Sequence, residues 1–328
     1  MVGITTTIPL EIPLAAGESI LDLNNLFVNH ETPQELIDKA EMAGFPRNTC
    51  GWIKGIYGAI QNFDIRKVIS VTEGDCSNTR ALMEVLSSQG IKIIPFAYPF
   101  EHSEKALAGQ IHSLAEQFQV DTAQIGQAKK HLDLIREKIH EIDRMTWQED
   151  RVTGRENHYF QVCSSDMNGD LDRFSLEIDS FLAEAGQRQP LKEDLRLAYV
   201  GVPPIFPDLY PALEKLGARV VFNETQRQFT MPFPTADIVD QYLHYTYPYG
   251  IFFRLEDIKK ELEKRRIDGV IHYVQSFCFR QIEDIVLRKN LSLPVLTLEG
   301  DQPAPLDARS LIRIECFLEM LRAAKGAS

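Results

Sequence analysis

Apolar residues along the chain gather in short continuous runs rather than alternating with polar ones. Such runs are typical of parallel strands that are buried on both faces of a sheet. Most runs are followed by a turn and a helix-like stretch of about ten residues or more, as in βαβ units. The runs form two sets, at about 45–100 and 195–325, so the pattern predicts two parallel α/β sheets. The expected strands are 67–72, 92–99, 195–203, 218–224, 268–274 and 293–299.

The stretch between the two sets, residues 101–189, has no strand-like run and few Gly or Pro. From Ile125 to Ile142, apolar residues recur at nearly helical spacing opposite a face of charged and His residues. The C-terminal segment "ARSLIRIECFLEMLRAA" is also an amphipathic helix. We therefore expect two Rossmann-like parallel-sheet domains with a helical linker and a C-terminal helix. The expected boundaries are 1–100 for the N-terminal α/β domain, 101–190 for the helical linker region and 191–328 for the C-terminal α/β domain.

Composition and charge narrow the class of protein. Hydrophobic residues make up 44% and charged residues 25%, as in ordinary globular proteins. The formal net charge of −12 argues against a nucleic-acid partner, which would select a basic surface. The first basic residue is Lys39, so no secretory signal is expected, and no apolar run reaches the ~18 residues of a membrane span. We expect a cytoplasmic protein without membrane or nucleic-acid contacts.

Cysteine spacing excludes the common local metal motifs. The odd number of cysteines, five, argues against a disulfide framework. No CxxC pair occurs, which excludes zinc-finger and ferredoxin spacings. A metal site in this chain would therefore draw its ligands from positions that are far apart in sequence. The cysteines are Cys50, Cys76, Cys163, Cys278 and Cys316.

Three cysteines lie just before expected helix N-termini, and two of them also follow expected strands, at the carboxyl ends where parallel sheets bind ligands. Cys76 follows the strand at 67–72, and Cys278 follows the strand at 268–274. Cys50 follows the turn "PRNT" and precedes a helical segment. A helix N-terminus stabilises a thiolate, the form of cysteine that binds metals. Metal ligation and burial as simple thiols both remain open for these three residues.

The other two cysteines lie within helical segments. Cys316 stands beside Phe317 and one turn before Met320, which predicts packing in the core. Cys163 lies in the helical linker region, and a role as a fourth metal ligand is an alternative to burial.

A few polar residues near the cysteines are candidates for lining a pocket. Asp75 and Asn78 flank Cys76, and Gln275 precedes Cys278. The alternative role for these three is to cap helices or to orient the cysteines by hydrogen bonds. Glu224 ends the strand at 218–224 and either faces the cleft or caps a turn. None of them is assigned as a catalytic acid or base.

Several segments match, in order, those of one known family. They are "IPLEIPLAAG", "RNTCGWIKGIYGAI", "GDCSNTRALMEVL", "TAQIGQAKKHLDLIREKI", "LRLAYVGVPP", "GARVVFNE", "DGVIHYVQSFC", "LPVLTLEGD" and "IRIECFLEML". Through them the chain resembles the 2-hydroxyacyl-CoA dehydratase family, which includes the catalytic subunits of 2-hydroxyglutaryl-CoA dehydratase and benzoyl-CoA reductase. The likeness runs nearly from end to end, and its order makes it more specific than any single motif.

The resemblance implies a cofactor and its ligands. In the family, three cysteines hold one 4Fe–4S cluster between the domains, and the matching residues here are Cys50, Cys76 and Cys278. Three thiolates on four irons leave one iron without a protein ligand, and an open metal position of this kind can bind a substrate. A larger, double-cubane cluster occurs in a relative and remains an alternative. Ser77 stands where many members have Asp, so the substrate stays open.

The resemblance also implies partners and a reaction. In the family, an ATP-hydrolysing activator supplies a low-potential electron, which the cluster passes to the thioester carbonyl of an acyl-CoA. This chain has no GxxxxGK[ST] loop, so ATP would be hydrolysed in trans. A dehydratase (lyase) or a reductase is implied, working as a homodimer or as a heterodimer with a paralogue. The alternatives are an iron–sulfur electron-transfer or cluster-carrying protein without a CoA substrate, and a scaffold with vacant cysteines.

Overall fold

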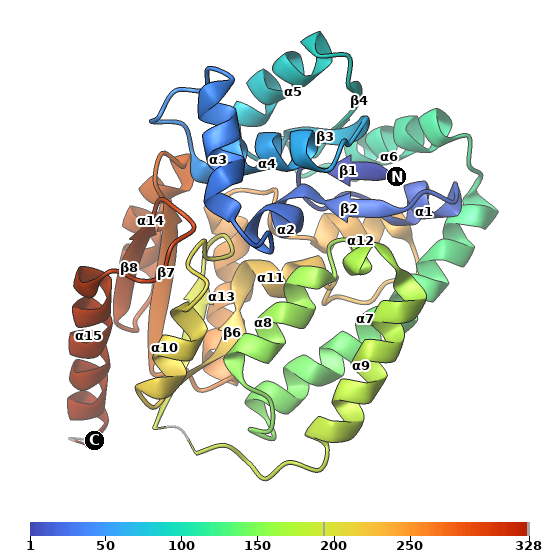
Figure 1. Cartoon of the computed structure of the whole chain (residues 1–328). Helices are drawn as coiled ribbons and strands as arrows, with labels where there is room; N and C mark the ends of the chain where they lie inside the picture. The colour runs from blue at the N-terminus through green and yellow to red at the C-terminus, as the bar shows by residue number, and fades with distance from the viewer. Residues whose placement is uncertain (193, 327–328) are drawn as a thin grey trace. The chain divides into compact units, whose positions relative to one another are not determined.

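The strands expected from apolar runs are all present in the computed structural model, which describes residues 1–192 and 194–326 (Figure 1). Two further strands, β1 (Val2–Ile4) and β2 (Ile20–Asp22), were not expected, because each is a run of three residues. The expected strands are β3 (Lys67–Glu73), β4 (Lys92–Ala97), β5 (Leu195–Val200), β6 (Ala218–Asn223), β7 (Gly269–Gln275) and β8 (Val295–Gly300).

The strands form two four-stranded sheets in which every pairing is parallel. The first sheet has the order β2-β1-β3-β4, and the second has the order β6-β5-β7-β8. In each sheet the chain reverses its direction of winding between the first and third strands in chain order. The carboxyl ends at such a switch point are where doubly wound folds bind ligands. The expected fold class, two parallel α/β sheets with a C-terminal helix, is therefore confirmed.

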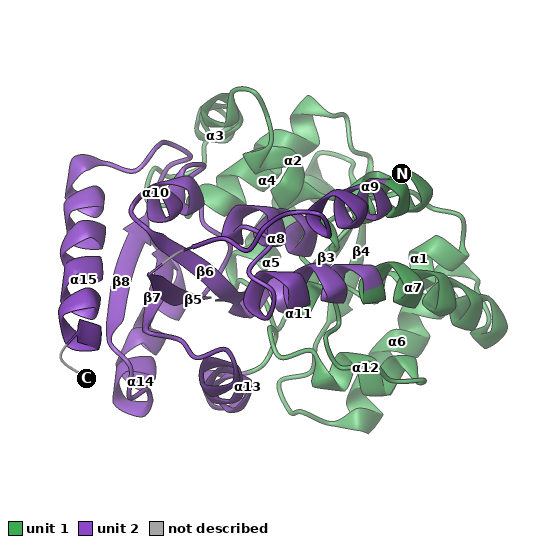
Figure 2. Ribbon diagram, turned by 90° about the horizontal axis from the view of Figure 1, so that it is seen from below, with its two compact units in different colours: residues 1–137, 163–176, 228–249 green, residues 138–162, 177–227, 250–328 purple. Residues whose placement is uncertain are grey.

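Contacts divide the described chain into two compact units, which Figure 2 shows in different colours. Unit 1 comprises residues 1–137, 163–176 and 228–249, and unit 2 comprises the remaining described residues. Each unit contains one of the sheets. Both units are assembled from segments that are far apart in sequence. The boundaries expected at residues 100 and 190 stay a prediction.

Helices follow or precede nearly every strand. The helices of the first half are α1 (Glu11–Ala15), α2 (Leu23–Val28), α3 (Pro33–Met42), α4 (Gly51–Asn62), α5 (Asn78–Ser88), α6 (Glu104–Phe118), α7 (Thr122–Trp147), α8 (Gly154–Cys163), the 3₁₀ turn η1 (Met167–Gly169) and α9 (Leu171–Ala185). Those of the second half are α10 (Leu209–Lys215), α11 (Glu224–Phe229), α12 (Ile238–His244), α13 (Ile251–Lys264), the 3₁₀ turn η2 (Phe279–Ile282), α14 (Glu283–Asn290) and α15 (Ala308–Gly326).

Two glycines allow α4 to pack closely in unit 1. A Cβ at Gly58 would lie 2.1 Å from the carbonyl oxygen of Leu36 in α3, and a Cβ at Gly55 would lie 2.4 Å from the ring of Phe27 in α2. Because neither position has room for a side chain, helix α4 rests directly on its neighbours. Its apolar face then joins the core that lies under β3. This packing fixes the helix that begins just after Cys50.

A pair of buried carboxyl groups anchors residues 163–176 to the rest of unit 1. Asp166 accepts a hydrogen bond from the backbone N–H of Asp22 (2.7 Å), and the hydroxyl of Ser165 donates to Asp22 Oδ2 (2.6 Å). Burial and the neighbouring Asp22 raise the pKa of Asp166 to about 7. Directly after Asp166, Met167 and Asn168 both adopt positive φ angles, of 52° and 51°. This connection is therefore strained as well as buried.

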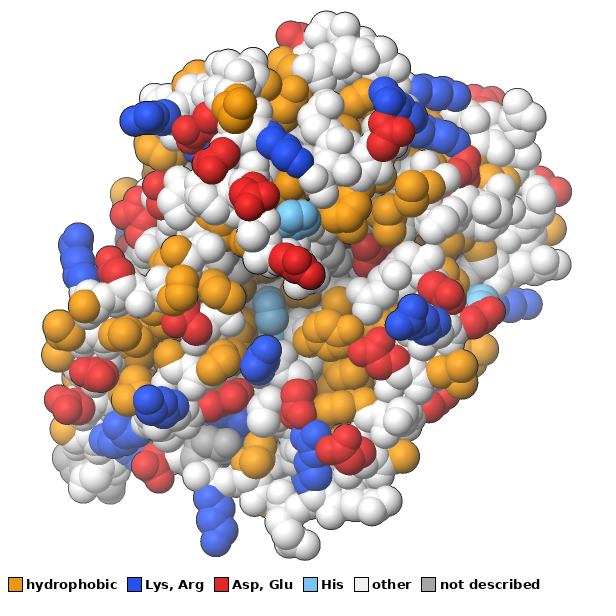
Figure 3. All heavy atoms as spheres, in the orientation of Figure 1, with side chains coloured by type: hydrophobic (Ala, Val, Ile, Leu, Met, Phe, Trp, Pro, Cys, Tyr) orange, Lys and Arg blue, Asp and Glu red, His pale blue; other side chains and the backbone are white. Residues whose placement is uncertain are grey.

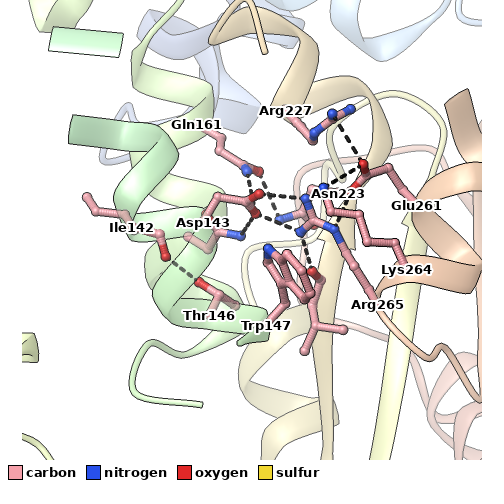
Figure 4. Close-up of polar contacts among 12 residues, drawn as sticks. Ile142, Asp143, Thr146, Trp147, Gln161, Asn223, Arg227, Glu261, Lys264 and Arg265 are labelled. Atoms are coloured by element: carbon pink, nitrogen blue, oxygen red, sulfur yellow. Dashed lines mark hydrogen bonds and ion pairs between the residues drawn. The ribbon is translucent and has the colours of Figure 1, made fainter. Parts of the chain in front are cut away.

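A network of buried charges ties α7 and α13 together in unit 2 (Figure 4). The guanidinium of Arg265 donates to both carboxylate oxygens of Asp143, at 2.8 and 2.6 Å, and to Glu261 at 2.6 Å. Its planar group also lies over the rings of Trp147 and Phe222, at 5.4 and 5.2 Å from their centroids. Burial alone would raise the pKa of Asp143, but Arg265 holds it below its usual value. Other members of this network are Arg227, Asn157, Gln161 and Asn223.

The surface mixes charges of both signs. On the face that Figure 3 shows, basic side chains lie scattered among acidic ones. None of the helices in the described part of the chain has the length and apolar character that crossing a bilayer requires.

Candidate functional site

Cys50 is the residue that precedes the first turn of α4, and it is buried, with 6% of its surface exposed. The loop before it is held by Lys54, whose fully buried ammonium group contacts Glu41 Oε1 at 2.8 Å and the carbonyl oxygen of Arg47 at 3.2 Å. Helix α4 runs back toward β3, so its N-terminus lies toward the carboxyl edge of the first sheet. A thiolate at this position would be stabilised by the N–H groups of the first turn of α4.

Cys76 lies three residues beyond the end of β3, in the loop that leads into α5. The loop turns at Gly74, whose φ of +86° suits glycine, and a Cβ there would lie 2.7 Å from Tyr98 and 2.8 Å from Pro248. The next residue, Asp75, accepts a hydrogen bond from the hydroxyl of Tyr247 at 3.1 Å. The loop thus contacts residues from other parts of unit 1.

Cys278 lies three residues beyond the end of β7 and caps the 3₁₀ turn η2. Its backbone N–H donates to the carbonyl of Gln275 at 3.0 Å, and its own carbonyl accepts from the N–H of Gln281 at 3.2 Å. Phe277 adopts a φ of +66°, which is unusual for a residue with a large side chain. Phe277 and Phe279, on either side of the thiol, are each about half exposed.

Cys76 and Cys278 occupy equivalent places in the two sheets. Each follows the third strand of its sheet in chain order, with the same offset of three residues. The equivalent of Cys50 in the second sheet is Gly250, which precedes α13 just as Cys50 precedes α4. The two sheets therefore offer three thiols at equivalent carboxyl-edge positions, and a glycine at the fourth.

The three thiols are divided between the units: Cys50 and Cys76 belong to unit 1, and Cys278 belongs to unit 2. Over residues 1–192 and 194–326, no three His, Cys, Asp or Glu side chains are gathered as a metal site. The assignment of these cysteines as ligands of one cluster stays a prediction. The donor set itself, thiolates at helix N-termini, has the chemistry that iron–sulfur clusters require.

The polar candidates near the cysteines make hydrogen bonds that shape the loops. Gln275 is buried, accepts from the hydroxyl of Tyr273 at 2.7 Å and donates to the carbonyl of Asp301 at 3.0 Å. Its backbone carbonyl also accepts from the side chain of Gln281 at 2.8 Å. Asn78 is half-buried and begins α5. These contacts favour an orienting role for Gln275.

Glu224 is buried and forms a two-point ion pair with Arg254, at 2.7 and 2.9 Å. It also accepts from the backbone N–H of Gly201, in the turn after β5, at 3.0 Å. Burial alone would raise the pKa of Glu224, but Arg254 keeps it below its usual value, so the carboxylate is charged. Arg254 also forms an ion pair with Glu283 at 2.5 Å. Glu283 in turn lies 3.7 Å from Arg280, which is two residues after Cys278. Glu224 therefore takes part in a chain of charges that reaches the Cys278 turn.

The two remaining cysteines differ in environment. Cys163 is buried at the end of α8. Cys316 is exposed, so the prediction that it packs in the core is wrong. The buried stripe of α15 consists of Ile314, Phe317, Leu318 and Leu321, and Cys316 lies two residues from Ile314, on the opposite side of the helix.

A segment that contacts the Cys76 loop was not predicted from the sequence. Residues 242–249, "YLHYTYPY", contain four of the ten tyrosines of the chain, and we call them the tyrosine segment. The segment ends the stretch 228–249 of unit 1, and the residues before and after that stretch belong to unit 2. Its unusual tyrosine content was a visible signal, but nothing in the sequence indicated its contact with a loop near residue 75.

Comparison with known proteins identifies the family. No curated protein sequence matches the chain significantly. The model of the family described as 2-hydroxyglutaryl-CoA dehydratase, D-component, matches residues 5–321, which is nearly the whole chain. The match spans the segments on which the resemblance rests. The chain therefore belongs to the 2-hydroxyglutaryl-CoA dehydratase D-component family.

Proposed function

We propose that this chain is an iron–sulfur subunit of the 2-hydroxyacyl-CoA dehydratase type, in which Cys50, Cys76 and Cys278 hold one 4Fe–4S cluster. The observation that carries the proposal is the placement of these thiols: Cys76 and Cys278 follow equivalent strands of the two parallel sheets by three residues, and Cys50 directly precedes α4. A family match over residues 5–321 supports the same assignment.

The local structure around each cysteine suits the task. Gly250, at the place equivalent to Cys50, has no side chain to offer as a further ligand. When bound, the cluster would supply a low-potential electron and one iron open to a substrate oxygen. Lys54, Tyr247 and Gln275 would hold the three cysteine loops in place through the hydrogen bonds described above. No residue of the chain is assigned as an acid or base.

The remaining parts of the proposal concern partners and substrate. The family name is that of one component of a dehydratase system, which agrees with a separate ATP-hydrolysing activator and with pairing as a homodimer or a paralogous heterodimer. We propose a CoA thioester as the substrate. The second candidate is a cluster-carrying or electron-transfer protein without CoA.

Iron analysis of protein purified without oxygen tests the cluster. We expect a brown protein with about four irons and four sulfides per chain, the content of one cubane. The variant Cys76→Ala should lose most of this iron, whereas Cys316→Ala, a change at an exposed thiol, should keep it. Iron and visible spectrum retained in full by Cys76→Ala would show that the assignment is wrong. Absence of iron from the wild-type protein would favour a scaffold.

Binding of a CoA thioester separates the first two candidates. The cluster-loaded protein is titrated with 2-hydroxyglutaryl-CoA, and the electron paramagnetic resonance spectrum of the reduced cluster is recorded with and without it. A change in the spectrum supports a substrate at the open iron. Binding that is undetectable at millimolar thioester, with the cluster intact, would favour the electron-transfer protein.

A further inference from the structure

Two successive residues of the Cys76 loop contact two successive residues of the tyrosine segment. Asp75 accepts the hydrogen bond of Tyr247, a residue that lies 172 positions later in the chain. Gly74 lies against Pro248, so closely that an added Cβ would approach the Pro248 ring to 2.8 Å. All four residues belong to unit 1. The tyrosine segment thus lies along the loop that presents the Cys76 thiol.

The tyrosine segment is itself firmly attached to unit 1. The hydroxyl of Tyr242 lies 2.9 Å from the carbonyl of Ile8 and 3.0 Å from Glu11 Oε2, and it accepts from the N–H of Leu10 at 3.3 Å. Burial alone would raise the pKa of Glu11, but Arg136 keeps it below its usual value, so the carboxylate is charged and accepts strongly. The carbonyl of Leu243 contacts His102 Nε2 at 2.7 Å. Such a segment can hold a neighbouring loop in place.

The Cys76 loop has little regular structure of its own to keep it ordered. Its turn uses the left-handed conformation of Gly74, and residues 74–77 lie between β3 and α5 and are exposed or half-buried. The first backbone bond of the following turn joins the N–H of Thr79 to the carbonyl of Cys76 at 3.0 Å. A fixed Asp75 would therefore limit the motion of the adjacent thiol and of this first turn.

We propose that Tyr247 is a positioning residue for Cys76: its hydroxyl holds Asp75 and so orders the loop that carries the thiol. The relevance of this loop to chemistry rests on the proposed function, whereas the ordering itself does not. The ring of Tyr247 also packs against Phe229 and Tyr245, with centroids 6.0 and 6.1 Å away. The variant Tyr247→Phe keeps this packing and removes only the hydroxyl.

Hydrogen–deuterium exchange of the cluster-free protein measures the ordering. In Tyr247→Phe we expect the amides of Thr79 and Arg80 to exchange about ten-fold faster than in the wild type, as for the loss of a hydrogen bond to a partly hydrated carboxylate. The matched control is Tyr159→Phe, which removes a phenol–carboxylate bond of 2.9 Å to Glu177 in α9. It should leave exchange at these two amides unchanged.

The conservative variant Asp75→Asn provides a second check, because its amide oxygen can still accept from Tyr247. The amide of Thr79 should therefore exchange more slowly in Asp75→Asn than in Tyr247→Phe. Equal exchange in Tyr247→Phe and wild type would refute the positioning role.

The reduced cluster gives a readout that separates this inference from the proposed function. If the wild-type protein binds iron, Tyr247→Phe should change the g-values of the reduced cluster, and Tyr159→Phe should not. Faster exchange in a protein that never binds iron would support the ordering and refute the cluster. A normal cluster with unchanged exchange and unchanged g-values would refute the ordering and leave the cluster assignment standing.

Discussion

Replacement of Arg265 by alanine tests how much the buried charge network contributes to stability. Arg265 is 1% exposed and donates to Asp143, to Glu261 and to the carbonyl of Val221. The substitution leaves two carboxylates in the interior of unit 2 without this shared cation (Figure 4). It also removes the cation from its place over the ring of Trp147.

The expected loss follows from the contacts that remain. Breaking a buried ion pair by removing one partner costs about 3–5 kcal/mol. Asp143 keeps the side-chain amides of Asn157 and Gln161, at 2.9 and 3.2 Å, and Glu261 keeps Lys264 at 3.1 Å. The stacking on Trp147 adds about 1 kcal/mol or more. We therefore expect Arg265→Ala to lose about 4 kcal/mol, a large share of a typical unfolding free energy of about 5–15 kcal/mol.

Urea unfolding followed by tryptophan fluorescence is a direct assay. The chain has two tryptophans, Trp52 in unit 1 and Trp147 in unit 2, so a Trp52→Phe background reports on the network alone. The matched control is Lys138→Ala, which breaks a pair of 2.7 Å between Lys138 and Asp179 whose side chains are 30% and 51% exposed. Exposed pairs contribute about 0–1 kcal/mol.

The comparison isolates burial, because both pairs have short bonds and involve α7. A double-mutant cycle of Arg265→Ala with Asp143→Ala should show a coupling of at least about 1 kcal/mol. If Arg265→Ala costs no more than Lys138→Ala, the reasoning about buried charge in this network is refuted.

Two further predictions concern unit 1. Because burial and Asp22 raise the pKa of Asp166 from 3.8 to about 7, its favourable contribution is complete below about pH 3.8 and is lost as the pH rises through 7. Relative to wild type, Asp166→Asn should therefore gain stability between pH 5 and pH 7, by up to about 1.4 kcal/mol per pH unit. Free energies of unfolding from urea titrations at several pH values measure this gain. If the free energies of the variant and the wild type change with pH in parallel, the assignment is contradicted. Gly58→Ala should cost about 1–3 kcal/mol, because its Cβ would lie 2.1 Å from the backbone oxygen of Leu36, while Gly126→Ala on α7, with open space around it, should cost nothing measurable by thermal unfolding.

The sheets could be predicted from the sequence because a strand buried on both faces leaves a local record. Its residues are mostly apolar without alternation, as in residues 269–275, where every residue is buried. The strands at 2–4 and 20–22 could not be recognised in this way. Each has only three residues, and the residues next to them include Thr, Pro and Ser, so no apolar run is visible. The burial of Cys316 was predicted wrongly. Its neighbour Phe317 is apolar and buried, but Cys316 itself lies outside the buried face of α15.

The surroundings of the cysteines could be predicted only in part. Their location directly before helices or after strands follows from the local pattern. Their supports do not, because they depend on contacts between distant residues such as Asp75 and Tyr247, or Glu224 and Arg254. Such pairs carry no periodicity and follow only once the topology has brought the segments together. Gly55 and Gly58 gave a partial signal, since two glycines in one helix favour close packing without naming the partner helix.

The three-segment composition of unit 1 has a consequence for how the protein is made. Residues 1–137 leave the ribosome first, but the tyrosine segment is synthesised about 110 residues later. At roughly 5–20 residues per second, the 173 residues from Cys76 to Tyr249 take about 9–35 s, so Cys76 waits that long before the segment that contacts its loop exists. Iron delivered during this interval would meet an incomplete loop, so maturation is expected to follow the synthesis of residue 249. For the same reason, a fragment that ends at residue 190 does not reproduce the environment of Cys76 in the full chain.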